Sequence, residues 1–284
     1  MSAVLPVVEG VRHRTVRVGA LDVHVAEAGA GEPLVLLHGW PQHWYCWRGV
    51  VPLLADRYRL VMPDLRGHGW TAAPKTGYDK EQLATDLLGL LDALELPQVG
   101  LVGHDWGGWT GFLACLRAPE RFRAFLALGI VPPFQQPSLA KALQGWRLAY
   151  QVPLGTPLLG PALMERTSKV VDAVVRFGSS RTVRDVSTYG EVLREPARAR
   201  ATSPLYRTFL LQESWRTGRY ADARLIVPTL LVNGAGDPVA SRSLVDGWQE
   251  HADEMSVEFL DGVGHFVPEK APDVVADRAR TLFG

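Results

Sequence analysis

The sequence of 284 residues predicts an α/β fold, in which a mostly parallel sheet with helices on both faces is interrupted once by a helical insertion. Short apolar runs bounded by glycine, proline or polar residues are typical of strands buried on both faces. These runs alternate with segments of helical periodicity, which favours a parallel sheet with crossover helices. Between residues 133 and 221 the alternation stops without a clear strand, and beyond this segment it resumes.

The elements before the insertion alternate regularly. Residues 12–18 and 21–28 alternate polar and apolar side chains around a two-residue turn, which predicts an antiparallel hairpin. Four apolar runs predict buried strands, at residues 34–37, 59–62, 99–102 and 122–128. Helical periodicity predicts helices over residues 79–94 and 106–117, with Asp79 as the N-cap of the first.

After the insertion the pattern of strands and helices returns. Apolar runs predict strands over residues 229–232 and 256–260, and helical periodicity predicts helices over residues 241–251 and 271–282. We therefore divide the chain into a first core part, an inserted helical segment and a second core part, at residues 1–132, 133–221 and 222–284.

The composition excludes several classes of protein. Hydrophobic residues make up 47% and charged residues 21%, which is typical of a globular chain and not of a disordered one. Lys and Arg total 30 and Asp and Glu total 30, so no net charge favours nucleic acid or a membrane as partner. Cys46 and Cys115 form no disulfide framework or metal-ligand spacing. Without a targeting signal or an apolar run long enough to span a membrane, a cytoplasmic protein is expected.

The motif with the clearest chemistry is GHDWGG at residues 103–108, between a predicted buried strand and a predicted helix. It matches the G-x-nucleophile-x-G pattern of a nucleophile elbow, whose glycines are needed because a sharp turn leaves no room for a Cβ. Such a turn places Asp105 at the carboxyl end of the sheet and at a helix N-terminus, which stabilises an anion. The alternative is that Asp105 only caps the helix.

An aspartate at the centre of this motif determines the class of reaction. A serine must first be deprotonated by a histidine and typically attacks a carbonyl carbon. The carboxylate of Asp105 is already ionised at pH 7, so it can displace a leaving group from saturated carbon and form an ester. A histidine is then available to activate water for the second step.

The acid and the histidine of the triad are expected to follow in chain order. Asp237 comes directly after the strand predicted at residues 229–232, and His265 lies in a glycine-flanked loop after the last strand. Taken singly, Asp237 could be a turn residue and His265 an ordinary loop histidine. Asp261 is a rival acid, although the Asp261–Gly262 pair is typical of a turn.

The loop at residues 38–41, which reads HGWP, follows the first core strand. In a fold of this kind an N–H from that loop completes an oxyanion hole with the N–H after the nucleophile. We assign the backbone N–H groups of Trp40 and Trp106 to this role. Pro41 is a candidate for a cis bond because the chain turns sharply there, and His38 is expected to bond to nearby backbone.

Five segments carry a resemblance to a known family: HGWPQHWYCW at 38–47, DLRGHGWT at 64–71, GHDWGG at 103–108, GDP at 236–238 and GHFVPE at 264–269. They resemble the α/β-hydrolase-fold epoxide hydrolases, whose nucleophile is an aspartate and which are related to the haloalkane dehalogenases. The resemblance implies an eight-stranded sheet, with residues 133–221 as a helical cap over the active site. It also implies no metal or organic cofactor, a small apolar epoxide and water as partners, and a monomer or homodimer.

The leaving group separates epoxide hydrolases from dehalogenases. An opening epoxide gives a basic alkoxide that needs an O–H donor, and the family supplies it from two cap tyrosines. The segments around Tyr150–Gln151 and Tyr206 resemble those that carry them, and Tyr189 is a reserve candidate. The resemblance thus implies a vicinal diol formed through an ester on Asp105 that His265-activated water hydrolyses, with Asp237 orienting the imidazole. Four residues are candidates to line the substrate pocket, although the tryptophans could instead pack in the core: Pro41, Trp44, Trp109 and Gln151.

Two other functions stay open. A haloalkane dehalogenase would use the same nucleophile and clamp the halide with Trp106 and either Trp146 or Trp215, but many of these enzymes carry an Asn where Trp40 stands. A fluoroacetate dehalogenase is disfavoured because that family resembles GHDRG, with Arg in place of Trp106. A non-catalytic small-ligand receptor on the same fold is the second alternative, although a receptor has no need of a histidine that activates water.

Overall fold

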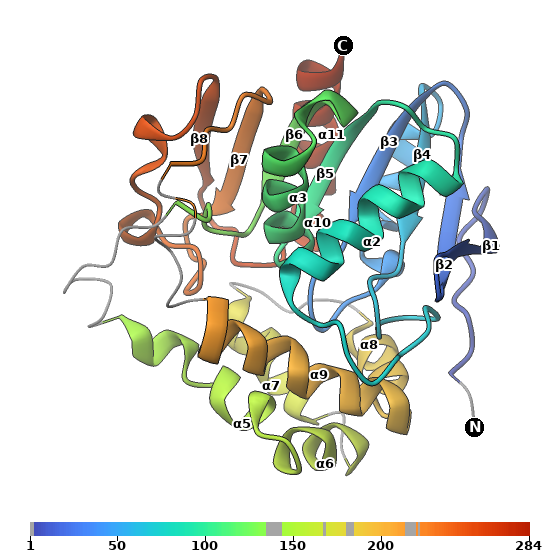
Figure 1. Ribbon diagram of the computed structural model, residues 1–284, viewed down its shortest axis with the longest axis vertical. Coiled ribbons are helices and arrows are strands. Elements are labelled where there is room, and N and C mark those ends of the chain that lie inside the picture. Colours follow the sequence, from blue (N-terminus) through green and yellow to red (C-terminus); the bar gives the residue numbers. More distant parts are fainter. Residues whose placement is uncertain (1–2, 135–143, 167–168, 180–184, 214–219, 221) are drawn as a thin grey trace.

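The computed structural model describes residues 3–134, 144–166, 169–179, 185–213, 220 and 222–284. Eight strands form one sheet in the order β1-β2-β4-β3-β5-β6-β7-β8 (Figure 1). The strands are β1 (Arg12–Val18), β2 (Leu21–Ala28), β3 (Glu32–Leu37), β4 (Tyr58–Pro63), β5 (Val99–His104), β6 (Phe122–Leu128), β7 (Thr229–Gly234) and β8 (Met255–Leu260). Only the pairs β1–β2 and β2–β4 are antiparallel, so the predicted eight-stranded, mostly parallel sheet is confirmed.

The core of the molecule is built on the apolar runs of the central strands. Leu34 of β3 pairs in register with Gly100 of β5, and Leu36 pairs with Val102. Each of these strands also has a second neighbour, β4 beside β3 and β6 beside β5. All six residues of β5 are buried, as are the last four of β3. This burial on both faces explains why their sequences are continuous apolar runs, whereas the edge strand β1 alternates.

Helices cover both faces of the sheet. Figure 1 shows α2 (Lys80–Ala93) and α3 (Trp106–Arg117) in front of the sheet and α11 (Pro272–Phe283) behind it. The predicted N-cap is confirmed, because the side chain of Asp79 accepts a hydrogen bond from the Gln82 N–H at 3.0 Å. Shorter helical elements complete this part: η1 (Trp44–Trp47), α1 (Val51–Leu54), η2 (Pro119–Arg121) and α10 (Val267–Lys270).

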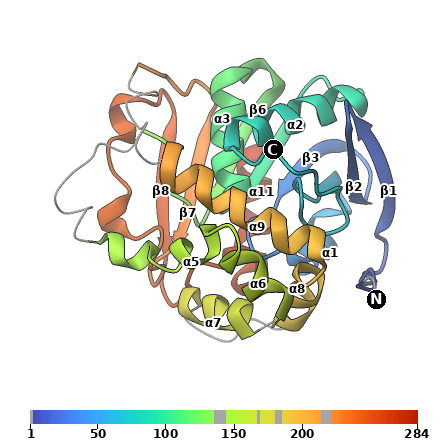
Figure 2. The ribbon, with the colours of Figure 1, turned by 60° about the horizontal axis from the view of Figure 1, so that its bottom comes forward.

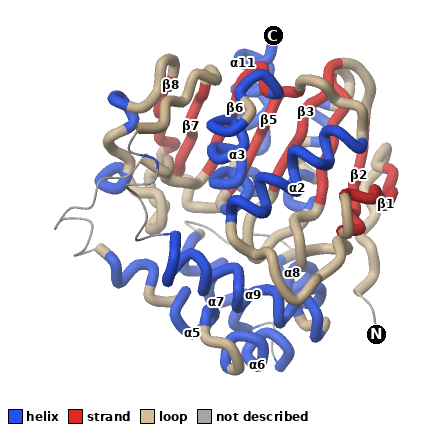
Figure 3. The backbone as a smooth tube through the Cα atoms, in the orientation of Figure 1, coloured by secondary structure: helices blue, strands red, loops and turns tan. Residues whose placement is uncertain are grey.

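A separate helical layer lies between β6 and β7 in the chain and below the sheet in Figure 1. It contains η3 (Gly145–Leu148), α5 (Gln151–Gly155), α6 (Leu159–Arg166), α7 (Lys169–Gly178), α8 (Val186–Leu193), α9 (Pro196–Thr208) and the π-helical turn Phe209–Glu213. Figure 2 shows α9 crossing this layer, and Figure 3 shows helices and loops there but no strand in the part drawn in colour. The ring of Tyr206 packs against Trp106, the residue after the elbow, so the layer meets the carboxyl end of β5.

The prediction of a helix over residues 241–251 is wrong. The structure has only two short 3₁₀ turns there, η6 (Arg242–Leu244) and η7 (Trp248–Glu250). Gly247, which precedes the second turn, has a φ of +71°, a left-handed conformation that interrupts a right-handed helix. In the part of the chain that the structure describes, no helix combines the length and the apolarity that crossing a bilayer requires.

Candidate active site

Asp105 occupies the turn between β5 and α3 with φ 52° and ψ −120°, a conformation that non-glycine residues rarely adopt. The neighbouring glycines are required by close packing. A Cβ at Gly103 would lie 2.6 Å from the Gly107 carbonyl oxygen, and a Cβ at Gly107 would lie 2.4 Å from the Leu37 carbonyl oxygen. The side chain of Asp105 makes no capping hydrogen bond to α3, which argues against the simple helix-cap interpretation.

Backbone N–H groups hold the carboxylate of Asp105. The Trp40 N–H donates to Oδ1 at 2.9 Å, and the Trp106 N–H also donates to this carboxylate. These are the two groups that the sequence predicts for an oxyanion hole, and the structure brings both to Asp105. Burial alone would raise the pKa of Asp105, but hydrogen bonds and the charge of His265 outweigh it and lower the pKa below its usual value.

His265 lies between two carboxylates. Its Nδ1 is 2.9 Å from Asp237 Oδ2 and its Nε2 is 3.5 Å from Asp105 Oδ2. Asp237 is itself fixed, because its Oδ1 accepts the N–H groups of Val239 at 2.7 Å and Ala240 at 3.1 Å. The predicted acid at 237 is therefore the one beside the imidazole. Burial lowers the pKa of His265, but the charges of Asp237 and Asp105 and the bonds to them prevail and raise it to about 10.

Tyr150 and Tyr206 converge on this site from the helical layer. Their ring centroids are 6.2 Å apart, and Tyr206 packs edge-on against Trp40 at 5.4 Å and Trp106 at 5.7 Å. Burial raises the pKa of both tyrosines, and the negative charge of Asp105 raises it further. Both hydroxyls therefore keep their protons and can act as hydrogen-bond donors at neutral pH.

Tyr189, the reserve candidate, lies in a different buried cluster. Its hydroxyl donates to Glu269 Oε1 and accepts from Arg48 at 3.2 Å. Arg48 in turn forms an ion pair with Glu269 Oε2 at 2.8 Å. This cluster joins α8 to α10 and to the end of η1. The position of Glu269 in the GHFVPE motif is the one sign of it in the sequence.

A small cavity of about 10 Å³ opens beside the imidazole, which is about the space that one water molecule occupies. Its walls come from both the sheet side and the helical layer: Trp40, Tyr150, Val174, Phe177, Gly178, Val239, His265 and Phe266. Sequence reasoning missed five of these, including Gly178. Val239 and Phe266 were detectable, since they adjoin motif residues, whereas nothing in the sequence says which face of α7 carries Val174 and Phe177 inward.

The four predicted pocket residues lie outside the lining of this cavity. Trp44 is a correction, because its fully buried ring packs on His13 at 4.7 Å and on Tyr45 at 5.7 Å, in the core. Trp109 packs against Phe209 at 5.5 Å, and Gln151 bonds to the Tyr150 hydroxyl. Pro41 follows Trp40 in the predicted cis conformation.

His38 plays the structural part expected of it. Its Nδ1 donates to the Gly39 carbonyl at 2.9 Å, and its Nε2 accepts the Leu65 N–H at 2.9 Å. Burial lowers its pKa to about 3, so it stays neutral and rigidly bonded. It thereby fixes the loop that presents the Trp40 N–H.

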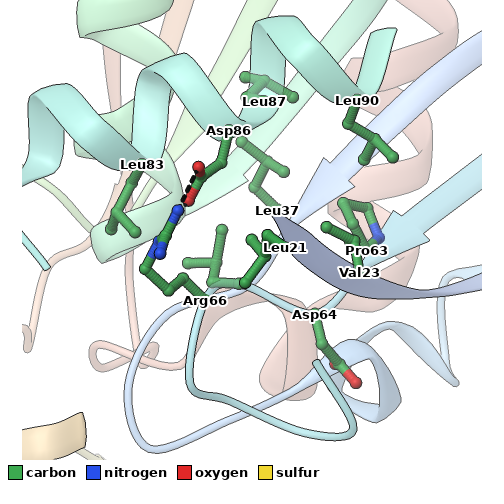
Figure 4. Close-up of a pocket in the computed structure, with 11 residues that line it drawn as sticks. Leu21, Val23, Leu37, Pro63, Asp64, Arg66, Leu83, Asp86, Leu87 and Leu90 are labelled. Carbon is green, nitrogen blue, oxygen red and sulfur yellow. Dashed lines mark hydrogen bonds and ion pairs between the residues drawn. The ribbon is translucent and has the colours of Figure 1, made fainter. Parts of the chain in front are cut away.

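Other features of the structure lie apart from this site. A cavity of about 20 Å³ lies between α2 and β2, β3 and β4, where Arg66 and Asp86 form an ion pair among apolar side chains (Figure 4). It contains none of the predicted site residues. Trp146 is 67% exposed, and Trp215 lies outside the described residues. Among the described residues, no group of three or more His, Cys, Asp or Glu side chains is arranged to hold a metal ion.

Comparisons with known proteins agree with the fold. The profile of the family described as alpha/beta hydrolase fold matches residues 32–272. A soluble epoxide hydrolase of Corynebacterium sp. (strain C12) is 31% identical over 96% of this chain and 97% of its own. A fluoroacetate dehalogenase of Burkholderia sp. is 37% identical over 44% of this chain and 43% of its own. The solved structure of epoxide hydrolase CorEH without ligand has a TM-score of 0.81 and 31% identity, over 96% of this chain and 98% of that one.

Proposed function

The chain belongs to the α/β-hydrolase fold family, among the epoxide hydrolases, and we propose that it converts an epoxide to a vicinal diol through an ester on Asp105. One observation carries this proposal. A buried carboxylate held by two N–H groups faces two protonated tyrosines on one side and a carboxylate-paired imidazole on the other. Each of these groups has a separate part in a two-step displacement.

In the first step, Asp105 attacks a carbon of the epoxide ring. Its Oδ1 is held by the Trp40 N–H, so Oδ2 is the oxygen that forms the new bond. The carbon–oxygen bond of the ring breaks, and a proton from Tyr150 or Tyr206 passes to the departing oxygen. The products of this step are a hydroxyalkyl ester of Asp105 and a tyrosinate, which is reprotonated before the next turnover.

In the second step, water attacks the ester carbonyl. His265 takes a proton from this water, and Asp237 stabilises the resulting imidazolium. The charge that develops on Oδ1 is stabilised by the N–H groups of Trp40 and Trp106, which in the resting enzyme donate to Oδ1 and to the Asp105 carboxylate, respectively. When the tetrahedral intermediate collapses, the bond between its carbon and the diol oxygen breaks. The proton of the newly added hydroxyl passes to that oxygen, which restores the carboxylate and releases the diol.

Esterification prepares the imidazole for its role as base. In the resting enzyme, the carboxylate of Asp105 helps to keep the pKa of His265 high, against the effect of burial. An ester at Asp105 has no charge, so the pKa of His265 falls when the intermediate forms. His265 then releases its proton more readily, and this proton restores the tyrosine hydroxyl. The neutral imidazole can accept a proton from water only after ring opening.

We also propose that residues 133–221 act as a cap. Tyr150 and Tyr206 come from this segment, and so do Val174 and Phe177 in the wall of the cavity. The cavity of about 10 Å³ that described residues line beside His265 has room for a water molecule but not for an epoxide. An epoxide that occupies this cavity therefore requires lining side chains of the helical layer, such as Phe177, to move aside.

The proposal is tested by trapping the ester. In a His265→Gln variant incubated with styrene oxide, the intact mass is expected to rise by one epoxide, and peptide mapping is expected to place it on Asp105. The double variant Asp105→Asn/His265→Gln is the control, and it should gain no mass. Diol production by the wild type without any adduct in His265→Gln would contradict the covalent route.

A haloalkane dehalogenase is the second candidate, and one observation favours it. The indole N–H of Trp106 is buried next to the nucleophile and is directed toward the Tyr206 hydroxyl. Such a donor suits a departing halide. An activity panel of aryl and alkyl epoxides beside short haloalkanes separates the two: diol without halide supports the first, and halide without diol supports the second. Absence of both products would favour the receptor.

A further inference from the structure

Lys80 is a fully buried cation that the catalytic scheme above does not use. It is the first residue of α2, and its side chain extends under the C-terminal end of α9. Its Nζ donates to the Leu205 carbonyl at 2.5 Å and lies 2.9 Å from Glu213 Oε2. The ammonium thus connects the sheet side of the molecule to the helix that carries Tyr206.

The Leu205 carbonyl needs a donor because α9 is irregular at this point. In a regular α-helix this carbonyl would accept the N–H of Phe209. Here the Phe209 N–H bonds to the Tyr206 carbonyl, and a π-helical turn follows over Phe209–Glu213. The Leu205 carbonyl instead accepts hydrogen bonds from Lys80 Nζ and, at 3.2 Å, from the Thr208 hydroxyl. The irregular turn directly adjoins the residue proposed to protonate the epoxide oxygen.

Lys80 also contacts Trp106, the residue whose backbone N–H is assigned to the oxyanion hole. Its Nζ lies 4.5 Å from the ring centroid of Trp106, and Tyr206 packs on the same ring at 5.7 Å. The ammonium and the tyrosine therefore share one aromatic neighbour, whose backbone N–H points at Asp105. Fixing Trp106 and the Leu205 carbonyl together restricts where the hydroxyl of Tyr206 can lie.

Placing this charge inside the protein is unfavourable by itself. Burial lowers the pKa of Lys80, although the charges of Glu213, Asp79 and Asp105 oppose that effect. An apolar side chain at this position would fill the space without that cost, but it would leave the Leu205 carbonyl with one donor fewer. The hydrogen bond is thus the property that distinguishes lysine from methionine here.

We propose that Lys80 is a positioning residue for ring opening, which holds α9 and Trp106 so that the Tyr206 hydroxyl faces the epoxide oxygen. The proposal rests on the proposed function, because it assigns Lys80 to the tyrosine-dependent step. It requires Lys80 to act on ring opening through Tyr206. Lys80 contacts the ring of Trp106 and not its backbone N–H, so the hydrolysis of the ester should keep its rate.

A double-mutant cycle tests this requirement. The rate of ester formation is measured by rapid quench and mass spectrometry for Lys80→Met in the wild-type and Tyr206→Phe backgrounds. We expect a loss of about 10²-fold in the first background, as for a misplaced catalytic group, and less than about twofold in the second. Ester hydrolysis should keep its rate. Lys75→Met, the same change at an exposed site five residues earlier, is the control. Equal losses in both backgrounds, or no loss, would overturn the proposal.

A second measurement does not depend on any reaction. Amide hydrogen exchange of residues 203–213 is expected to speed up at least about tenfold in Lys80→Met, whereas exchange in α3 stays unchanged. If Lys80→Met fails to fold, Lys80→Met/Glu213→Gln removes the unpaired carboxylate and takes its place. Unaltered exchange would show that Lys80 does not hold the end of α9, even if epoxides are opened. If the wild type forms no ester but exchange speeds up in Lys80→Met, the proposed function fails, whereas the structural role of Lys80 in holding α9 is retained.

Discussion

At the scale of single residues, the protonation state of His265 is set by its two carboxylate neighbours. Asp237 and Asp105 together overcome burial and raise the pKa of this imidazole to about 10. The proposed mechanism depends on one of these charges being removable, since only Asp105 is esterified. The pKa of His265 is therefore the quantity that links the two steps.

Replacing Asp105 with Asn imitates this loss of charge. We expect the pKa of His265 to fall, because one of the carboxylates that raise it is gone while burial and Asp237 remain. Titration of the imidazole nitrogens by ¹⁵N NMR measures the change. Asp261→Asn serves as the control, because Asp237 and not Asp261 bonds to the imidazole. An unchanged pKa in Asp105→Asn would show that Asp105 does not govern the base.

The two tyrosines give a second prediction at this scale. Tyr206→Phe and Tyr150→Phe are each expected to slow ring opening by about 10²-fold, the range found for general acids. The double variant should lose it almost entirely, because no O–H donor then faces the alkoxide. Ester formation is followed by rapid quench. Tyr189→Phe is the comparison, since its hydroxyl is bonded to Glu269 instead. A loss of ring opening in that variant would transfer the acid role to Tyr189.

The residues of the candidate site and Lys80 differ in how well their roles could be predicted from the sequence. Asp105, Asp237 and His265 lie in glycine-rich turns directly after strands, and local motifs specify such turns. Tyr150 and Tyr206 were reached only through a family resemblance, because their convergence depends on how the helices pack. Lys80 gave no signal at all, since a lysine after the N-cap Asp79 is typical of an exposed first turn.

At the scale of elements, α7 determines how much space lies beside the imidazole. It brings Val174 and Phe177 to the cavity, and the ring of Phe177 lies 6.3 Å from that of Tyr150. Phe177 is 46% exposed, so it stands between the cavity and solvent. The size of this side chain should therefore limit which epoxides enter.

We predict that Phe177→Ala lowers KM for bulky aryl epoxides by about tenfold and leaves the ring-opening rate of small alkyl epoxides unchanged. The first effect follows from the removed ring, and the second from the unaltered distances among Asp105, His265 and Asp237. Steady-state kinetics with a graded series of epoxides measures both. Ala173→Ser, an exposed change on the same helix, is the control. An equal change in KM for all epoxides would place the entrance elsewhere.

The elements themselves were predictable wherever a local pattern decides them. Buried strands such as β3 and β5 are continuous apolar runs, and Asp79 marks the start of α2. The helix expected over residues 241–251 failed because Gly247 adopts a left-handed φ of +71°. The apolar spacing of this segment does not reveal that a glycine within it adopts this conformation.

At the scale of the whole molecule, the candidate site lies where the sheet meets the inserted helical layer. Asp105, Asp237 and His265 follow strands of the sheet. In the inserted layer, Tyr150 directly precedes α5 and Tyr206 lies in α9. The two parts are joined at one end by Arg48, Tyr189 and Glu269. Lys80 and the Leu205 carbonyl join them near α9. The buried charges that the proposed reaction uses therefore also contribute to the stability of the fold. The free energy of unfolding should change when these site residues change protonation state.

The pH dependence of stability tests this link. The pKa of His265 is raised in the folded protein from 6.5 to about 10 by Asp237 and Asp105, in spite of burial. A histidine with a raised folded pKa stabilises the fold fully below pH 6.5, and this contribution disappears as pH rises through about 10. The free energy of unfolding of the wild type, measured by urea titration, should thus decline toward that of His265→Gln across this range. Groups that titrate equally in both proteins cancel in the difference.

Asp237→Asn should shift the decline in the free energy of unfolding to lower pH, because it removes the stronger of the two charges that raise the pKa of His265. Parallel curves for the wild type and His265→Gln would mean that the imidazole is already neutral in the resting enzyme, and the proposed timing of the base would be wrong.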